Sequence, residues 1–259
     1  MTDLAEQLVN TTLQQGIYHI ELNRPAAGNA ANLAMAEQLL AAVQALSTTA
    51  GVRVVLVSAA GRAFMAGGDL KVLQGDPAVL KQVLGMVNQT ILLLSECELP
   101  IVCAVQGLAA GGGLGLALAA DFLIAAEDAR LSVGAPAIGL SPDAGVSWQL
   151  ARWVGMRKAM DMALLCTSLD GQAALACGLV SQLVPKAQLM EAAWQCAMQL
   201  AAGSQQALRH TKRLLRASLQ SDLPSQLQLE EAAFADCAAG PDFAEGLAAL
   251  MDKRKPQFV

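Results

Sequence analysis

Hydrophobic positions along the first half of the chain follow two different spacings. Residues 17–22 alternate apolar and polar side chains, which predicts a strand, whereas residues 33–46 place six apolar side chains on one helical face. The short apolar runs at 52–57 and 101–105 are typical of strands buried on both faces. The same reasoning predicts helices at 77–94 and 113–119 and a strand at 122–125. Strands that alternate with helices predict an α/β fold with parallel crossover connections.

From Met156 onward the strand pattern fades and helical patterns dominate. The predicted helices span residues 158–165, 170–177, 187–202, 204–218, 223–238 and 243–253. No low-complexity linker and no internal repeat interrupts the chain. We therefore expect an α/β core over residues 1–195, followed by a helical C-terminal region over residues 196–259.

Composition narrows the class of protein. Apolar residues make up 54% of the chain and charged residues 15%, which excludes intrinsic disorder. The net charge of −5 and the aromatic content of 3% argue against a nucleic-acid partner, which needs a basic face and stacking platforms. So low a charge fraction also indicates that partner subunits cover some apolar surface.

We expect a cytoplasmic protein without a metal site. The six cysteines form no C-x-x-C pair and there are only two histidines, which favours free thiols in a reducing compartment. The first seven residues carry two acids and no base, unlike a signal peptide. Residues 99–120 lack charge over a length that could span a membrane, but Pro100, Gln106 and Gly111–Gly113 interrupt them. A buried strand, a glycine turn and a helix explain that segment better, so we expect no membrane partner.

Two glycine-rich stretches, Gly61–Lys71 and Gly107–Gly115, each follow a predicted buried strand. Glycines at such a place expose backbone N–H groups, which suit an anion or a developing oxyanion. Their spacing fits neither G-x-G-x-x-G nor a P-loop. Two such stretches in one core could place two donors on one carbonyl oxygen, as enolate-forming and acyl-transfer chemistry requires. Close packing of helix on sheet is the alternative interpretation.

In this order, the two stretches resemble the crotonase (enoyl-CoA hydratase/isomerase) superfamily, which reads roughly G-x-A-F-x-A-G-x-D and then G-x-A-x-G-G-G. The resemblance extends from Leu22–Pro25 to Asp252–Phe258 and includes Ala174 and Gly178. It implies a crotonase-like spiral of ββα turns and a helical trimerisation region over residues 196–259. It also implies an acyl-CoA thioester substrate, no separate cofactor, and a homotrimer or a dimer of trimers.

The same resemblance assigns the oxyanion hole to the backbone N–H groups of Gly68 and Gly112. The substrate-binding residues that it implies are Arg24, Ala66, Asp69, Leu70, Lys71, Asn88 and Ala135. Taken alone, an arginine or lysine is a solvated charge, and Asp69 is a residue that shapes its loop.

The acid/base residues depart from the hydratase pattern. Hydratases that resemble crotonase carry two glutamates, and this chain has Gly115 and Ala135 at those positions. One carboxylate remains nearby, that of Asp143, in a segment similar to the I-G-L-x-P-D-x-G of ring-epoxide isomerases in phenylacetate degradation. A single aspartate can move a proton from one carbon to another. Alternatively, Asp143 caps a helix that begins near Ala144.

We therefore expect an acyl-CoA isomerase with Asp143 as its acid/base residue. It would convert a 3-enoyl-CoA to a 2-enoyl-CoA, or isomerise the ring epoxide of an aryl-acetyl-CoA, through a thioester enolate. The alternatives are an enoyl-CoA hydratase with a non-standard acid/base group and a non-catalytic acyl-CoA-binding subunit. A dehalogenase of the 4-chlorobenzoyl-CoA type is disfavoured, because Asn88 and Ala135 stand where its histidine and tryptophan would be.

Overall fold

A computed structural model describes residues 6–258, and its strands form two sheets. The larger sheet has the order β1-β2-β3-β4-β6-β9, in which only β1 runs antiparallel to its neighbour. Its strands are β1 (Val9–Gln14), β2 (Ile17–Leu22), β3 (Val54–Ala59), β4 (Ile101–Val105), β6 (Phe122–Ala126) and β9 (Gln182–Val184). The smaller sheet contains β5 (Leu108–Ala110), β7 (Arg130–Ser132) and β8 (Leu169–Asp170). These parallel crossovers confirm the predicted α/β class. Residues 1–5 of the N-terminal stretch considered above lie outside the described residues.

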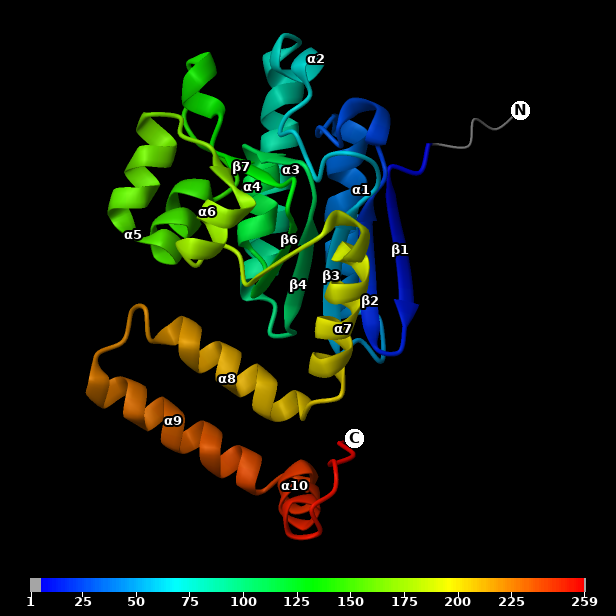
Figure 1. Ribbon diagram of the computed structural model, residues 1–259, viewed down its shortest axis with the longest axis vertical. Coiled ribbons are helices and arrows are strands. Elements are labelled where there is room, and N and C mark those ends of the chain that lie inside the picture. The colour runs from blue at the N-terminus through cyan, green and yellow to red at the C-terminus, as the bar shows by residue number, and fades with distance from the viewer. Residues whose placement is uncertain (1–5, 259) are drawn as a thin grey trace.

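The helices surround the larger sheet and then continue beyond it (Figure 1). Those of the core are α1 (Leu33–Gln44), α2 (Leu70–Leu73), α3 (Pro77–Glu96), α4 (Gly112–Leu118), α5 (Val146–Leu164), α6 (Gly171–Ala176) and α7 (Leu189–Ala201). The C-terminal helices, in orange and red at the bottom of Figure 1, are α8 (Gln205–Ala217), α9 (Leu223–Ala238) and α10 (Pro241–Met251). Short 3-10 helices occur at η1 (Pro25–Ala27), η2 (Ala45–Ser47), η3 (Ala135–Ile138) and η4 (Lys186–Gln188).

Strand β3 illustrates why the predicted parallel strands read as continuous apolar runs. Val54 and Leu56 belong to the hydrophobic cluster that α7 completes on one face of the sheet. Val55 and Val57 belong to the larger cluster on the opposite face, together with residues of α1 and α3. Because both faces are covered, no position of the strand favours a polar residue until Ser58.

Helix α7 packs against the larger sheet and so belongs to the core. Its Ala193, Ala197 and Ala201 are buried in the cluster against the sheet, and their small side chains let the helix approach closely. The expected boundary between residues 195 and 196 therefore falls inside α7. The first helix that leaves the sheet is α8, which begins at Gln205.

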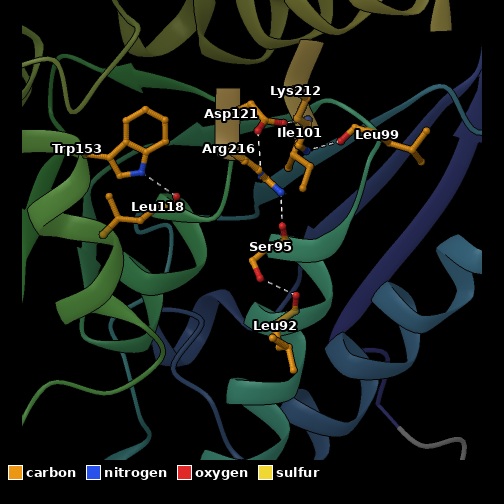
Figure 2. Close-up of polar contacts among 9 residues, drawn as sticks. All are labelled: Leu92, Ser95, Leu99, Ile101, Leu118, Asp121, Trp153, Lys212 and Arg216. Atoms are coloured by element: carbon orange, nitrogen blue, oxygen red, sulfur yellow. Dashed lines mark hydrogen bonds and ion pairs between the residues drawn. The ribbon is translucent and has the colours of Figure 1, made fainter. Parts of the chain in front are cut away.

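A group of charged side chains fastens α8 to the core (Figure 2). Asp121, just after α4, binds Lys212 at 2.6 Å and Arg216 at 3.0 Å, and also accepts the backbone N–H of Ile101 at 2.8 Å. One carboxylate thus satisfies a strand amide and two cations at once. The two cations also donate to backbone carbonyl groups at the junction of α3 and β4, those of Ser95 and Leu99.

Two expectations about the elements need correction. The helix predicted for 158–165 is the second half of α5, which begins at Val146 and bends at Gly155, where φ is 75°. The strand signal was predicted to fade after Met156, yet β8 and β9 follow it, and at two and three residues they are too short to produce an alternating pattern.

The uncharged segment 99–120 forms β4, β5 and α4, as expected from its interruptions. By length and composition alone α3 could cross a membrane, and its Val83, Val87 and Ile91 lie buried in the core.

Candidate active site

The two glycine-rich stretches pair with each other. The N–H of Met65 donates to the carbonyl of Leu108 at 3.0 Å, and the N–H of Ala110 donates to the carbonyl of Met65 at the same distance. These bonds form a parallel bridge between Met65 and Ala109. Gly68 and Gly112 each lie three residues beyond the bridge, so the register carries both glycines to the same end of the two strands.

Glycine is required where the two loops approach. Gly67 and Gly111 have φ of 102° and 50°, in the region that other L-residues rarely adopt. A β-carbon on Gly67 would lie 3.1 Å from the carbonyl oxygen of Ala110 and 3.9 Å from the α-carbon of Gly111. The two backbones therefore pack together without intervening side chains.

Gly68 and Gly112 offer two backbone donors at this point. Ala31 bonds to the carbonyl of Gly67 and the N–H of Asp69, which leaves the N–H of Gly68 pointing away from that pairing. Gly112 is the first residue of α4, where an N–H has no acceptor within the helix. Within residues 6–258, neither N–H donates to a protein acceptor, and Gly68 is exposed. The two N–H groups can therefore donate hydrogen bonds to an oxyanion, as the resemblance implies.

Arg24 and Asp69 brace the loop that carries Gly68. Nη1 of Arg24 donates to Oδ2 of Asp69 at 2.6 Å and to the carbonyl of Ala30 at 2.8 Å. Oδ1 of Asp69 accepts the N–H of Lys71 at 2.8 Å and so caps α2. Burial opposes ionisation of Asp69, but the bonds from Lys71 and Arg24 outweigh it and lower the pKa of this carboxyl. Both residues thus have a bracing contact, while their contact with substrate stays a prediction.

Sequence reasoning missed Asn29, which joins three segments around the same loop. Its side chain is fully buried and donates to the carbonyls of Ala60 and Ala63, both at 2.9 Å, while Oδ1 accepts the N–H of Arg24 at 2.7 Å. Asn29 has a φ of 55°, a backbone conformation that asparagine tolerates better than most residues. The Gly28-Asn29 pair was the available signal, because it is typical of a turn.

Asp143 lies in a tight turn and not at a helix cap. Its carbonyl accepts the N–H of Val146 at 3.0 Å, and the two residues between them, Ala144 and Gly145, have φ of 49° and 68°. Two successive positive φ values are characteristic of a type I′ turn. Helix α5 begins at Val146 with Gly145 as its N-cap, so the capping alternative for Asp143 is wrong. Burial raises the pKa of the Asp143 carboxyl, and the bond from its own backbone N–H opposes that effect only in part.

This turn lies beside the predicted oxyanion hole. A β-carbon on Gly112 would be 3.9 Å from the β-carbon of Ala144 and 3.8 Å from Cγ1 of Val87. Gly112 therefore lies between α3 and the turn that carries Asp143. The structure thus brings Gly68, Gly112 and the Asp143 segment into one neighbourhood.

The other predicted substrate-binding residues surround this centre less closely. Leu70 and Lys71 are exposed on α2, and Ala66 is exposed in the loop before it. Asn88 is exposed on α3, next to Val87 in sequence. Half-buried Ala135 begins η3, and its carbonyl accepts the N–H of Leu140 at 3.0 Å. A pocket behind Gly112 is apolar, with a volume of about 10 Å³, and its lining includes Met35, Met65, Val87, Ile91 and Leu116. An acyl group would enter it only if flexible side chains such as those methionines moved.

Comparison with known proteins finds similar sequences over nearly the whole chain. The family model described as enoyl-CoA hydratase/isomerase matches residues 12–259. A Rhodobacter capsulatus protein named "probable enoyl-CoA hydratase" is 38% identical over 95% of this chain and 96% of its own. The 1,2-epoxyphenylacetyl-CoA isomerase of Escherichia coli is 33% identical over 98% of both chains, and the 2,3-dehydroadipyl-CoA hydratase of the same organism is 35% identical over 95% and 96%.

The fold is shared as well. The crystal structure of an enoyl-CoA hydratase from Bacillus anthracis superposes with a TM-score of 0.92 at 31% identity, over 97% of this chain and 99% of the other. That match includes the C-terminal helices and confirms the spiral fold that the sequence resemblance implied. The names of these relatives include both water-adding and isomerising enzymes.

Proposed function

The chain belongs to the enoyl-CoA hydratase/isomerase family, and from that premise we propose that it isomerises acyl-CoA thioesters with Asp143 as its acid/base residue. The observation that carries the proposal is the position of Asp143. Its partly buried carboxyl, with a raised pKa, belongs to the turn that packs against Gly112, whereas Gly115 and Ala135 supply no carboxylate.

A proton shuttle by one aspartate accounts for the whole reaction. With a 3-enoyl-CoA, the carboxylate of Asp143 takes a proton from C2, and the electron pair of that C–H bond moves toward the thioester oxygen. The N–H groups of Gly68 and Gly112 hold the resulting dienolate oxygen. Asp143 then returns the proton to C4, which leaves a double bond between C2 and C3. No atom is gained or lost, so neither water nor a second acid is needed.

The raised pKa suits both halves of this shuttle. A carboxyl in a less solvated place is a stronger base when ionised, and once protonated it keeps the proton from the solvent until C4 accepts it. The ring epoxide of an aryl-acetyl-CoA is the second substrate class, supported by the identity to the epoxyphenylacetyl-CoA isomerase.

Hydration is the competing function, since several relatives are named hydratases. Addition of water requires one group that activates water and another that delivers the α-proton. Gly115 and Ala135 occupy the two glutamate positions, so a hydratase would need acid/base groups elsewhere in the chain. A non-catalytic binding subunit would need no acid/base group.

We also propose that the chain assembles as a homotrimer or a dimer of trimers. Large apolar side chains are exposed on the C-terminal helices, among them Leu223 and Phe234 of α9 and Leu250 and Met251 of α10, each at least 70% exposed. Faces of this kind are covered by protein in most stable folds. Light scattering of the purified chain tests the assembly.

The activity is tested by incubation with a 3-enoyl-CoA in deuterated water, followed by mass spectrometry. We expect a conjugated 2-enoyl-CoA with no added water, and a decrease in kcat of about 10²–10⁴-fold in Asp143→Asn, the usual contribution of general acid/base catalysis. Calorimetry on Asp143→Asn should still detect thioester binding. A product heavier by one water supports the hydratase instead. Binding without conversion of either the enoyl thioester or the aryl epoxide supports the non-catalytic alternative.

A further inference from the structure

Gly115 faces the turn that carries Asp143. A β-carbon on Gly115 would lie 2.8 Å from the β-carbon of Ala144 and closer still to the Ala144 carbonyl oxygen. Separations below 3.0 Å are essentially absent between real β-carbons and their neighbours, and a backbone oxygen cannot rotate away as a side chain can. The turn therefore occupies the space that any side chain at position 115 would fill.

The backbone of this turn is strained, and contacts to α4 hold it in place. Ala144 is 1% exposed and has a φ of 49°, a conformation that is sterically unfavourable for an L-residue. Such strain persists only where surrounding contacts impose it, and it is frequent at active sites. Here the surface against the turn is α4, which approaches Ala144 most closely at Gly115, where it has no side chain.

Gln149 ties the same two segments together. It lies in the first turn of α5 with only 5% of its surface exposed. Its backbone N–H donates to the carbonyl of Gly145 at 2.9 Å, and its side-chain Nε2 donates to the carbonyl of Gly115 at 3.1 Å. One buried residue thus fixes the end of the turn relative to the middle of α4.

From these contacts we infer that Gly115 is a positioning residue for Asp143, acting through Ala144 and supported by Gln149. The missing side chain lets the turn pack onto α4, which holds the turn, and with it the partly buried Asp143, beside Gly112. This inference rests on the proposed function for its kinetic consequence, but its structural part stands on the packing alone. It also means that Gly115 has a function in the isomerase geometry beyond the loss of a hydratase glutamate.

The test is Gly115→Ala, compared with Gly85→Ala. Gly85 lies in α3, and a β-carbon there would meet no atom within 4 Å, so this control adds a methyl group to a helix without a clash. We expect Gly115→Ala to lower kcat about 100-fold, the usual consequence of misplacing a catalytic group by about 1 Å. KM should change little, and Gly85→Ala should match the wild type.

The pH profile separates positioning from general damage. A displaced turn exposes Asp143 to solvent, so the pH at which kcat/KM falls on the acid side should move down in Gly115→Ala, toward the ordinary value of an aspartate. A lower kcat with an unmoved acid limb would indicate a structural defect only and would overturn the inference. Wild-type kcat together with the wild-type profile would overturn it as well.

A second variant covers the case in which Gly115→Ala folds poorly. Ala144→Gly removes the nearer carbon and suits the positive φ, so the Gly115→Ala, Ala144→Gly pair should recover part of the lost kcat. No recovery in a folded double variant counts against Ala144 as the intermediary.

Failure of the proposed function would look different. If Asp143→Asn keeps wild-type activity, or if the wild type converts no thioester, the isomerase proposal fails. The position of the turn can then still be tested by a carboxyl NMR titration of Asp143 in the wild type and in Gly115→Ala. Equal pKa values in the two proteins would overturn the positioning inference independently of any activity.

Discussion

Nη1 of Arg24 lies 2.6 Å from Oδ2 of Asp69, one residue away from the backbone N–H of Gly68. Their side chains are only 21% and 11% exposed, so water screens the pair weakly. Arg24, predicted to bind substrate, thus also supports the loop that carries Gly68, one half of the predicted oxyanion hole.

Arg24→Met should separate these two functions of Arg24. A bracing function predicts a lower kcat and a decrease in the free energy of unfolding of about 1.5–3 kcal/mol, the usual value for a hydrogen bond to a charged group. Steady-state kinetics and urea unfolding measure the two quantities. Arg24→Lys keeps the charge and serves as the control. If only the affinity for free coenzyme A falls, as followed by calorimetry, Arg24 acts on the ligand and not on the loop.

Gly112→Pro removes one oxyanion donor with little effect on the helix. Gly112 is the first residue of α4, a position at which proline is well tolerated because its N–H is not used within the helix. We expect kcat to fall about 10²–10³-fold, as in other enzymes that lose one such donor. Gly112→Ala retains the N–H and makes only ordinary contacts, at 3.8 and 3.9 Å, so it should lose far less. Equal losses in the two variants would point to crowding and not to the donor.

His19 should make the fold sensitive to acid. Its ring bonds to Ser58 at 2.7 Å and packs edge-on against Trp194, with a centroid separation of 5.8 Å. Burial lowers the pKa of His19 below the ordinary value for a histidine, although Glu21 partly opposes this. The unfolded chain therefore binds this proton more readily, and the free energy of unfolding should decrease as the pH falls below about 6.5. Urea unfolding at pH 7.5 and 5.5 measures it, and His19→Gln should show a smaller difference between the two. An equal difference in both proteins would assign the effect to other groups.

Removing Asp121 should lower the free energy of unfolding more than removing its partner Lys212. Asp121→Ala leaves Lys212, whose side chain is 9% exposed, without its counter-charge and should lower the free energy of unfolding by about 3–5 kcal/mol. Lys212→Met should cost less, because Asp121 keeps Arg216 and the N–H of Ile101. The double variant should recover part of the loss, as a double-mutant cycle by denaturant unfolding would measure. A larger loss in Lys212→Met than in Asp121→Ala would contradict this account.

The core of the fold could be predicted from sequence because burial on both faces leaves a clear pattern. Strands such as 101–105 are continuous apolar runs with no other explanation at that length. By contrast, β8 has only two residues, and its place is decided by pairing with β7. The helical pattern predicted the extent of α7, but it did not predict that the alanines of α7 pack against the sheet.

The candidate site was predictable only where chemistry leaves a residue signature. Glycine runs and a lone aspartate were visible, whereas the bridge between Met65 and Ala109 depends on two loops that only the fold brings together. The turn at Asp143 was not predicted, and the alternative interpretation placed a helix start there, because a proline-aspartate pair suits both structures. Ala144 gave no sign of its positive φ, since the turn packs against Gly115, which lies far away in sequence.

The charged group that fastens α8 also has a consequence for synthesis of the chain. Arg216 is made 95 residues after Asp121, which takes about 5–20 seconds at ordinary rates of translation. During that interval the sheet can form, but Lys212, the cation that binds the Asp121 carboxylate and the Leu99 carbonyl, has not yet been synthesised. A chain that stops before residue 212 therefore lacks both cations, and the Leu99 carbonyl and the Asp121 carboxylate at the start of β4 keep no partner from α8.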